Sequence, residues 1–146
     1  MLSFLMWLVA GLLLGALFLS FAGRGSRERE LHVLSIGLFV AALLYLGFSL
    51  LGGAQSKWIL MESAGVLLYG AVAWAGVKHA PRLLALGWAL HMVWDAALHL
   101  QGAPAQYTPG GYALLCIGFD LLVAGYILRP RPAERPKAVV SDPHAA

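Results

Sequence analysis

The chain has 146 residues, of which 60% are hydrophobic and 12% are charged, and its mean hydropathy is +0.77. Such values lie well outside the usual composition of a soluble globular domain and predict an integral membrane protein. The net charge of +3 does not indicate nucleic-acid binding, because the basic residues lie at the ends of apolar runs, and the single cysteine, Cys116, excludes an internal disulfide.

The first apolar run covers residues 2–22. At 1.5 Å per residue, about twenty helical residues cross the roughly 30 Å hydrocarbon layer of a membrane. A signal peptide is the competing interpretation, but no Lys or Arg precedes the run, and a signal-peptide core has only roughly 7 to 15 residues. We therefore interpret the run as a transmembrane helix.

Four further apolar runs cover about residues 31–51, 57–77, 83–100 and 112–128. The segments between them are a polar connection with three arginines, a glycine-rich turn, a break around a proline, and an uncharged loop at residues 101–111 that could serve as a lid. The sequence thus predicts an all-α fold, a polytopic membrane protein with five transmembrane helices in one bundle over residues 1–128. Residues 129–146 are predicted to be a disordered basic cytoplasmic tail.

The distribution of Lys and Arg predicts the orientation of the bundle. Nine of the ten lie in the first connection, the third connection and the tail, and the other is Lys57 in the second connection. By the positive-inside rule, the N-terminus is outside and the C-terminus is cytoplasmic. We expect a multi-pass protein of a bacterial inner membrane, with membrane lipids and no nucleic acid as its partners.

Three titratable residues, His91, Asp95 and His99, follow one another at intervals of four within the fourth run. In an α-helix these positions lie roughly 40° and 80° apart, so the side chains share one face. Each ionisable group at membrane depth costs about 2.5 to 3.5 kcal/mol and usually faces the interior of a bundle. Helix register places Asp120 about 12 Å below the outer boundary, level with His91, and Glu62 about 7 Å below it. The sequence therefore predicts a polar cluster in the outer half of the membrane.

A divalent metal ion would account for this cluster. Asp95 could hold an ion together with His99 or His91 and with Asp120, with one position open for water, and Glu62 could act as the general base of a hydrolase. Because the two histidines are about 12 Å apart along the axis, one ion would use only one of them, and two ions would use both. Zinc is the default for such ligands, with iron or manganese as alternatives. Further candidates for the pocket are Cys116, Trp94 and Tyr112.

The cluster is also compatible with two roles that need no metal. Helical His and Asp chains also carry protons, so the protein could be a proton-coupled transporter or an accessory subunit, and a carrier of five helices would need to form a homodimer. The cluster could also be a structural network that only holds the helices together. Glu62 is ambiguous in each case, because it lies close enough to the interface to extend to water. The metal hypothesis leads to a hydrolase that acts on a lipid or another amphiphile.

The spacing of these residues resembles that of an uncharacterised family of small bacterial multi-pass membrane proteins. Its features are a His-x-x-Trp-Asp-x-x-x-His helix, here His91, Trp94, Asp95 and His99, and a following segment, here Pro109, Tyr112, Cys116 and Asp120. The resemblance covers about half of the chain and implies that the cluster is a family trait, but it implies no activity. A looser likeness to the membrane hydrolase superfamily of alkaline ceramidases and progestin-type receptors is an analogy only, because those proteins have seven helices and their serine and third histidine have no clear counterpart here.

Overall fold

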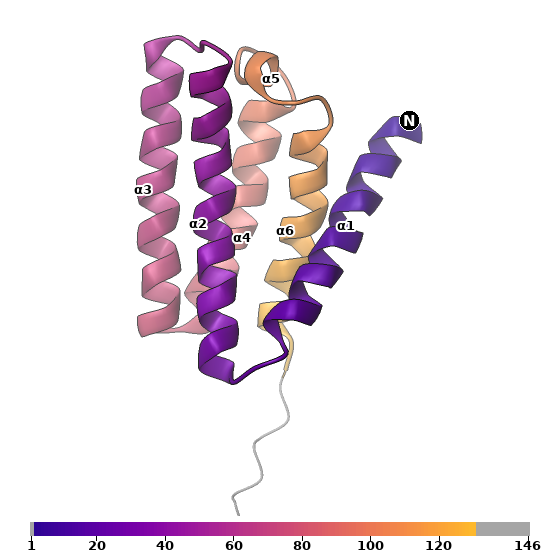
Figure 1. Ribbon diagram of the computed structural model, residues 1–146, viewed down its shortest axis with the longest axis vertical. Coiled ribbons are helices and arrows are strands. Elements are labelled where there is room, and N and C mark those ends of the chain that lie inside the picture. Colours follow the sequence, from indigo (N-terminus) through magenta and orange to yellow (C-terminus); the bar gives the residue numbers. More distant parts are fainter. Residues whose placement is uncertain (1, 131–146) are drawn as a thin grey trace, which may run out of the picture.

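The structure, a computed structural model, describes residues 2–130, and the regular elements of this part of the chain are all helices (Figure 1). In chain order they are α1 (Leu2–Ala22), α2 (Arg27–Leu51), α3 (Ser56–Lys78), α4 (Pro81–Trp94), the π-helical turn η1 (Asp95–His99), α5 (Pro104–Tyr107) and α6 (Tyr112–Leu128). The predicted all-α class is confirmed for these residues. The predicted disordered tail covers residues 129–146, and residues 131–146 of it lie outside the described residues.

The helices begin and end close to the predicted apolar runs, with two differences. Helix α2 begins at Arg27 instead of residue 31, because Ser26 caps it by accepting a hydrogen bond from the Arg29 amide. Two glutamates in its first turn complement the helix dipole. In the fourth run, the α-helix ends at Trp94 and a π-helical turn follows, which the sequence did not predict.

Three helices, α1, α2 and α3, are long and apolar enough to cross a membrane. Helix α6 is apolar but has only 17 residues, and α4 has 14 residues before the five residues of η1 extend it. The three long helices have the length and composition expected of a membrane protein. Five spans and the direction of insertion stay predictions.

The main helices stand side by side, and α1 leans outward at its N-terminal end (Figure 1). Helix α1 packs mainly on α6 and makes only a small contact with α2. A Cβ on Gly11 would overlap the carbonyl oxygen of Leu115, and a Cβ on Gly118 would overlap that of Leu8. The two glycines therefore allow the backbones of α1 and α6 to touch where the helices cross.

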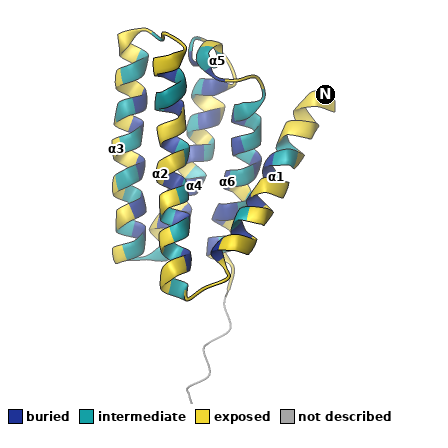
Figure 2. Cartoon of the chain, viewed as in Figure 1, coloured by how far each residue is buried: buried dark blue, intermediate teal, exposed yellow. Residues whose placement is uncertain are grey.

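Buried residues line the inner faces of the helices (Figure 2), and their chemistry differs between the two ends of the bundle. At the end where α2 begins, the core is apolar and includes Leu34, Leu38, Leu84, Trp88 and Val123. A clamp closes this end: the Tyr126 hydroxyl donates a 2.6 Å hydrogen bond to Glu30, which also pairs with Arg27 at 3.1 Å. Toward the other end, the buried side chains are polar and include Tyr45, Ser49, Glu62, His91, Asp95, His99 and Asp120.

The basic residues of the described chain lie mostly at the apolar end. All of them except Lys57 are near the α1–α2 connection, near the α3–α4 connection or directly after α6, and these segments share one end of the bundle (Figure 1). Lys57 lies at the opposite end, where its ammonium group is 5.2 Å from the centre of the Trp58 ring. The polar half of the core is therefore the half that the charge distribution predicts to face outward.

Candidate functional site

Three buried side chains meet in the polar half: His91 from α4, Asp95 from η1 and Asp120 from α6. Nδ1 of His91 lies 2.8 Å from Oδ2 of Asp120 and 3.5 Å from Oδ2 of Asp95. One potential ligand atom from each residue lies within 4.8 Å of the others, which is close enough for all three to hold one metal ion. The three residues, here called the His-Asp-Asp group, meet because α4 and α6 pack on each other and place His91 opposite Asp120.

Several polar atoms in and beside this group have no hydrogen-bond partner within the described chain. They include Nε2 of His91 and Nδ1 of His99. A buried polar group without a partner costs about 1 to 3 kcal/mol, and more when it is charged. Buried polar atoms are usually satisfied by protein groups, ordered water or an ion, so these nitrogens are the atoms of the cluster that can receive such a partner.

A second buried group lies next to the first, toward α5. Glu62 of α3 accepts two hydrogen bonds at Oε1, one from Nε2 of His99 at 3.0 Å and one from the Tyr107 hydroxyl at 2.8 Å. Because Glu62 is only 2% exposed, its side chain belongs to the interior and does not extend to water. We call Glu62, His99 and Tyr107 the glutamate group.

The short helix α5 covers this end of the bundle as a lid (Figure 1). It lies close to the α2–α3 turn: a Cβ on Gly52 would come within 2.6 Å of the Cβ of Tyr107, so the position needs a residue without a side chain. Burial and the hydrogen bond to Glu62 raise the pKa of Tyr107, which keeps its hydroxyl protonated as a donor. The lid is thus held to the glutamate group by a side-chain hydrogen bond.

Tyr45 of α2 lies between the two groups and was not among the residues predicted for the pocket. Its ring centre is 3.9 Å from that of His99 and 5.8 Å from that of His91, and the side chain is fully buried. The sequence contains one indication of this position. Leu34, Leu38 and Ala42 form a buried stripe along α2, and Tyr45 continues that stripe at helical spacing. A polar residue that extends such a stripe to the depth of the cluster is expected to contact the cluster.

The π-helical turn separates His99 from the residues with which it was grouped. The predicted face assumed a regular α-helix, but from Asp95 to His99 the turn is wider, and its hydrogen bonds span five residues instead of four. His99 pairs with Glu62, while Asp95 stays beside His91. Such turns are frequent at functional sites.

The other predicted pocket residues surround the two groups. Cys116 is buried one turn before Asp120, and both line the same cleft. Tyr112 packs its ring against that of Tyr45, with centres 5.6 Å apart. Trp94 packs against α3, so it supports the contact between α3 and α4.

An apolar cleft of about 400 Å³ lies between α1, α2 and α6 and reaches the His-Asp-Asp group. Most of its wall consists of apolar side chains, among them Leu14, Phe18, Val40, Leu44 and Phe119. Asp120 and Cys116 form part of the same wall. The cleft therefore runs from the side where α1 makes little contact with α2 to one carboxylate of the buried site.

Comparison with known proteins gives a family but no activity. The model of a family of unknown function, DUF6010, matches residues 6–133, and this range includes both buried groups. No curated protein and no solved structure matches the chain.

Proposed function

The chain belongs to this family of unknown function, and we propose that it is a membrane-embedded, metal-dependent hydrolase of a lipid or another amphiphile. The observation that carries the proposal is the His-Asp-Asp group, whose three potential ligand atoms lie within 4.8 Å of one another in a fully buried position. In this proposal the group lies in the outer half of a five-span bundle in a bacterial inner membrane, with the N-terminus outside and the C-terminus cytoplasmic.

The residues of the group suit a divalent ion. One imidazole nitrogen and two carboxylates are ligands that zinc, iron and manganese accept, and zinc is the default. His91 would bind through Nδ1, because this nitrogen faces both carboxylates. When bound, the ion would polarise a carbonyl group and activate a water molecule. Because Glu62 already engages His99, this histidine is not part of the proposed ligand set.

Glu62 is the proposed general base. Both of its hydrogen bonds reach Oε1, so neither occupies Oε2, which can accept a proton from the attacking water. His99 and Tyr107 fix the orientation of the carboxylate. The lid residue Tyr107 would thus act as a positioning residue, and α5 would keep bulk water away from the reaction.

The apolar cleft supports an amphiphilic substrate. Its volume of about 400 Å³ lies within the roughly 300 to 1,000 Å³ of small-molecule sites. In a membrane its outer side would be in contact with hydrocarbon, so an apolar chain could enter sideways while the group to be hydrolysed reaches Asp120. A polar, water-soluble substrate would gain no binding free energy from contact with these apolar side chains.

Elemental analysis of the detergent-purified protein tests the metal site. We expect near-stoichiometric zinc, iron or manganese in the wild type, and its loss in Asp95→Asn and Asp120→Asn. Because His99 lies outside the proposed ligand set, His99→Ala should retain the ion, as should the control Tyr126→Phe at the other end of the bundle. A wild type that is metal-free after purification without chelators, and that cannot be reloaded, would overturn the proposal.

Hydrolysis of a panel of ester and amide amphiphiles tests the catalytic role of Glu62. We expect Glu62→Gln to keep the metal but to lose about 100-fold to 10,000-fold in rate, the usual contribution of a general base. The exposed Glu28 offers a matched control, and Glu28→Gln should retain the activity. Equal rates for Glu62→Gln and the wild type would show that another residue takes the proton.

A second candidate function, proton transfer, is favoured by the position of Tyr45. Its ring lies between His91 and His99 and so connects the two buried groups into one series of titratable side chains. Proteoliposomes with an imposed pH gradient distinguish the two functions. A proton carrier would dissipate the gradient, and Asp120→Asn would prevent this, whereas a hydrolase would leave the gradient intact. An accessory subunit would need a partner protein for this activity.

A further inference from the structure

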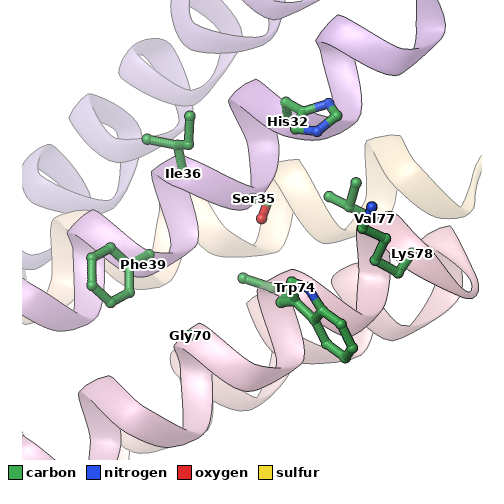
Figure 3. A pocket seen from close by; sticks show the side chains of 9 residues that line it. His32, Ser35, Ile36, Phe39, Gly70, Trp74, Val77 and Lys78 are labelled. Carbon is green, nitrogen blue, oxygen red and sulfur yellow. The ribbon is translucent and has the colours of Figure 1, made fainter.

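A groove of about 340 Å³ lies between α2 and α3, in the half of the bundle that holds the basic residues (Figure 3). Its lining comes from the first half of α2 and the second half of α3: His32, Ser35, Ile36, Phe39, Gly70, Ala73, Trp74, Val77 and Lys78. None of these residues belongs to the two buried groups. The groove is therefore independent of the proposed hydrolytic site.

Most of the groove has the chemistry of the hydrocarbon layer. Ile36 and Phe39 on α2 and Trp74 and Val77 on α3 supply apolar lining, and Gly70 lies beside the Phe39 ring (Figure 3). A Cβ on Gly70 would come within 3.3 Å of the Phe39 ring, so this glycine keeps the groove open. The groove thus accepts a thin apolar chain.

The length of the groove matches one leaflet of a membrane. From Lys78 to Gly70 it follows eight residues of α3, or about 12 Å at 1.5 Å per residue. Half of the roughly 30 Å hydrocarbon layer is about 15 Å. An acyl chain of the leaflet at the basic end would therefore lie in the groove with its head group beside Lys78.

The end of the groove is positively charged. Lys78 is exposed and makes no ion pair within the described chain, and His32 lies across the groove from it (Figure 3). Nδ1 of His32 donates to the Glu28 carbonyl at 2.8 Å, so Nε2 of the neutral ring is an acceptor, and the positive charge at this end is that of Lys78. Trp74, with 61% of its surface exposed, flanks this end in the manner of an interfacial anchor. The charge of this end complements a phosphate group.

We propose that the groove binds one phospholipid with an anionic head group, such as phosphatidylglycerol. The phosphate lies beside Lys78, and one acyl chain follows the groove toward Gly70. Basic sites between transmembrane helices on the cytoplasmic side are known to select anionic lipids. The bound lipid holds α2 and α3 together at the end opposite to the lid.

Lipid titrations of the detergent-purified protein, followed by native mass spectrometry and by melting temperature, test the proposal. We expect phosphatidylglycerol to bind and to raise the melting temperature more than phosphatidylcholine with the same acyl chains. Lys78→Gln should weaken phosphatidylglycerol binding about five-fold, the effect of one basic residue near an anionic surface. Lys57→Gln, at the opposite end and also beside a tryptophan, should leave binding unchanged.

A second variant tests the groove itself. Gly70→Leu fills the space beside Phe39 and should weaken the binding of phosphatidylglycerol while Lys78 is intact. Gly125→Leu, on the exposed side of α6 where a Cβ meets nothing within 4 Å, is the control. The proposal is overturned if phosphatidylcholine binds equally well, if neither Lys78→Gln nor Gly70→Leu weakens binding, or if soluble glycerol phosphate gives the same stabilisation, which would indicate a plain anion site.

Discussion

Two carboxylates share one imidazole nitrogen at the centre of the bundle. Nδ1 of His91 can donate only one proton, and Asp120 at 2.8 Å is better placed to accept it than Asp95 at 3.5 Å. The polar neighbours of Asp95 are the Tyr45 hydroxyl and, at the longer distance, Nδ1 of His91. Protonation of Asp95 or a shared cation would reduce the free-energy cost of burying its charge, and a cation would compensate the charges of both aspartates at once.

If a cation fills this role, its removal should destabilise the protein. We expect a strong chelator to lower the melting temperature of the wild type by several degrees, because an ion at 100 times its dissociation constant contributes about 2.7 kcal/mol. Asp120→Asn, which lacks a ligand, should melt at the same temperature with and without chelator. Differential scanning fluorimetry in detergent measures both. An equal response of the two proteins to the chelator would contradict a metal held by Asp120.

The hydrogen bond between Tyr107 and Glu62 gives a prediction about pH. Burial and this bond raise the pKa of Tyr107, so folding favours the protonated hydroxyl. The contribution is complete below the unfolded-state pKa of about 10 and is lost as the pH rises through the higher folded-state pKa. Tyr107→Phe should cost about 1 kcal/mol near neutral pH, and its difference from the wild type should shrink in strongly alkaline solution. Melting temperatures across the alkaline range measure this, and a difference that stays constant with pH would be contrary to the proposed bond.

For single residues, helix register predicted the depth of a side chain in the bundle, but the sequence did not predict which side chains form hydrogen bonds with one another. Equal depth in antiparallel helices led to the expectation that His91 and Asp120 are level, and their side chains form a hydrogen bond. The partners of Glu62 could not be foreseen, because one of them, Tyr107, lies in the short helix α5, whose position over the bundle depends on tertiary contacts. The functional roles of these residues stay predictions.

Among the elements, the crossing of α1 and α6 depends on glycines at the contact. A Cβ on Gly118 would overlap the backbone of α1, so Gly118→Ala should force the helices apart and cost about 1 to 3 kcal/mol. Gly125→Ala, in the same helix but with open space around it, should instead stabilise the helix by up to about 1 kcal/mol. The opposite signs make the comparison decisive: if both variants raise the melting temperature, helix propensity and not the crossing determines the effect.

The sequence predicted the helices better than it predicted the geometry inside them. Apolar runs located α1 and α6 at the residues that the structure gives them, because long hydrophobic stretches leave little choice of boundary. The π-helical turn η1 has no such pattern. Its five residues, Asp95 to His99, have the same spacing of polar positions as an α-helix, so the wider turn depends on tertiary contacts, which η1 makes with α5 and α6.

For the whole molecule, the two ends of the bundle have different chemistry. The basic residues, the apolar core and the clamp between Glu30 and Tyr126 lie at one end, and the polar cluster and the lid lie toward the other. The anionic-lipid groove and the proposed hydrolytic site would therefore contact opposite leaflets. Stabilisation by a lipid at one end and chemistry at the other could then be separated by mutation.

This polarity depends on the direction of insertion, which cysteine labelling in intact cells can establish. In a Cys116→Ser background, a cysteine replacing Gln55 in the α2–α3 connection should react with a membrane-impermeant maleimide, because the N-terminus-outside topology exposes this connection. A cysteine replacing Gly25 in the α1–α2 connection should react only after lysis, because the arginines around it favour the cytoplasmic side. The reverse pattern would invert the bundle and place the lid in the cytoplasm, and labelling of both positions in intact cells would rule out α2 as a span. Since the lipid groove and the metal site lie at opposite ends, this single assay decides which leaflet supplies the anionic lipid and which supplies the substrate.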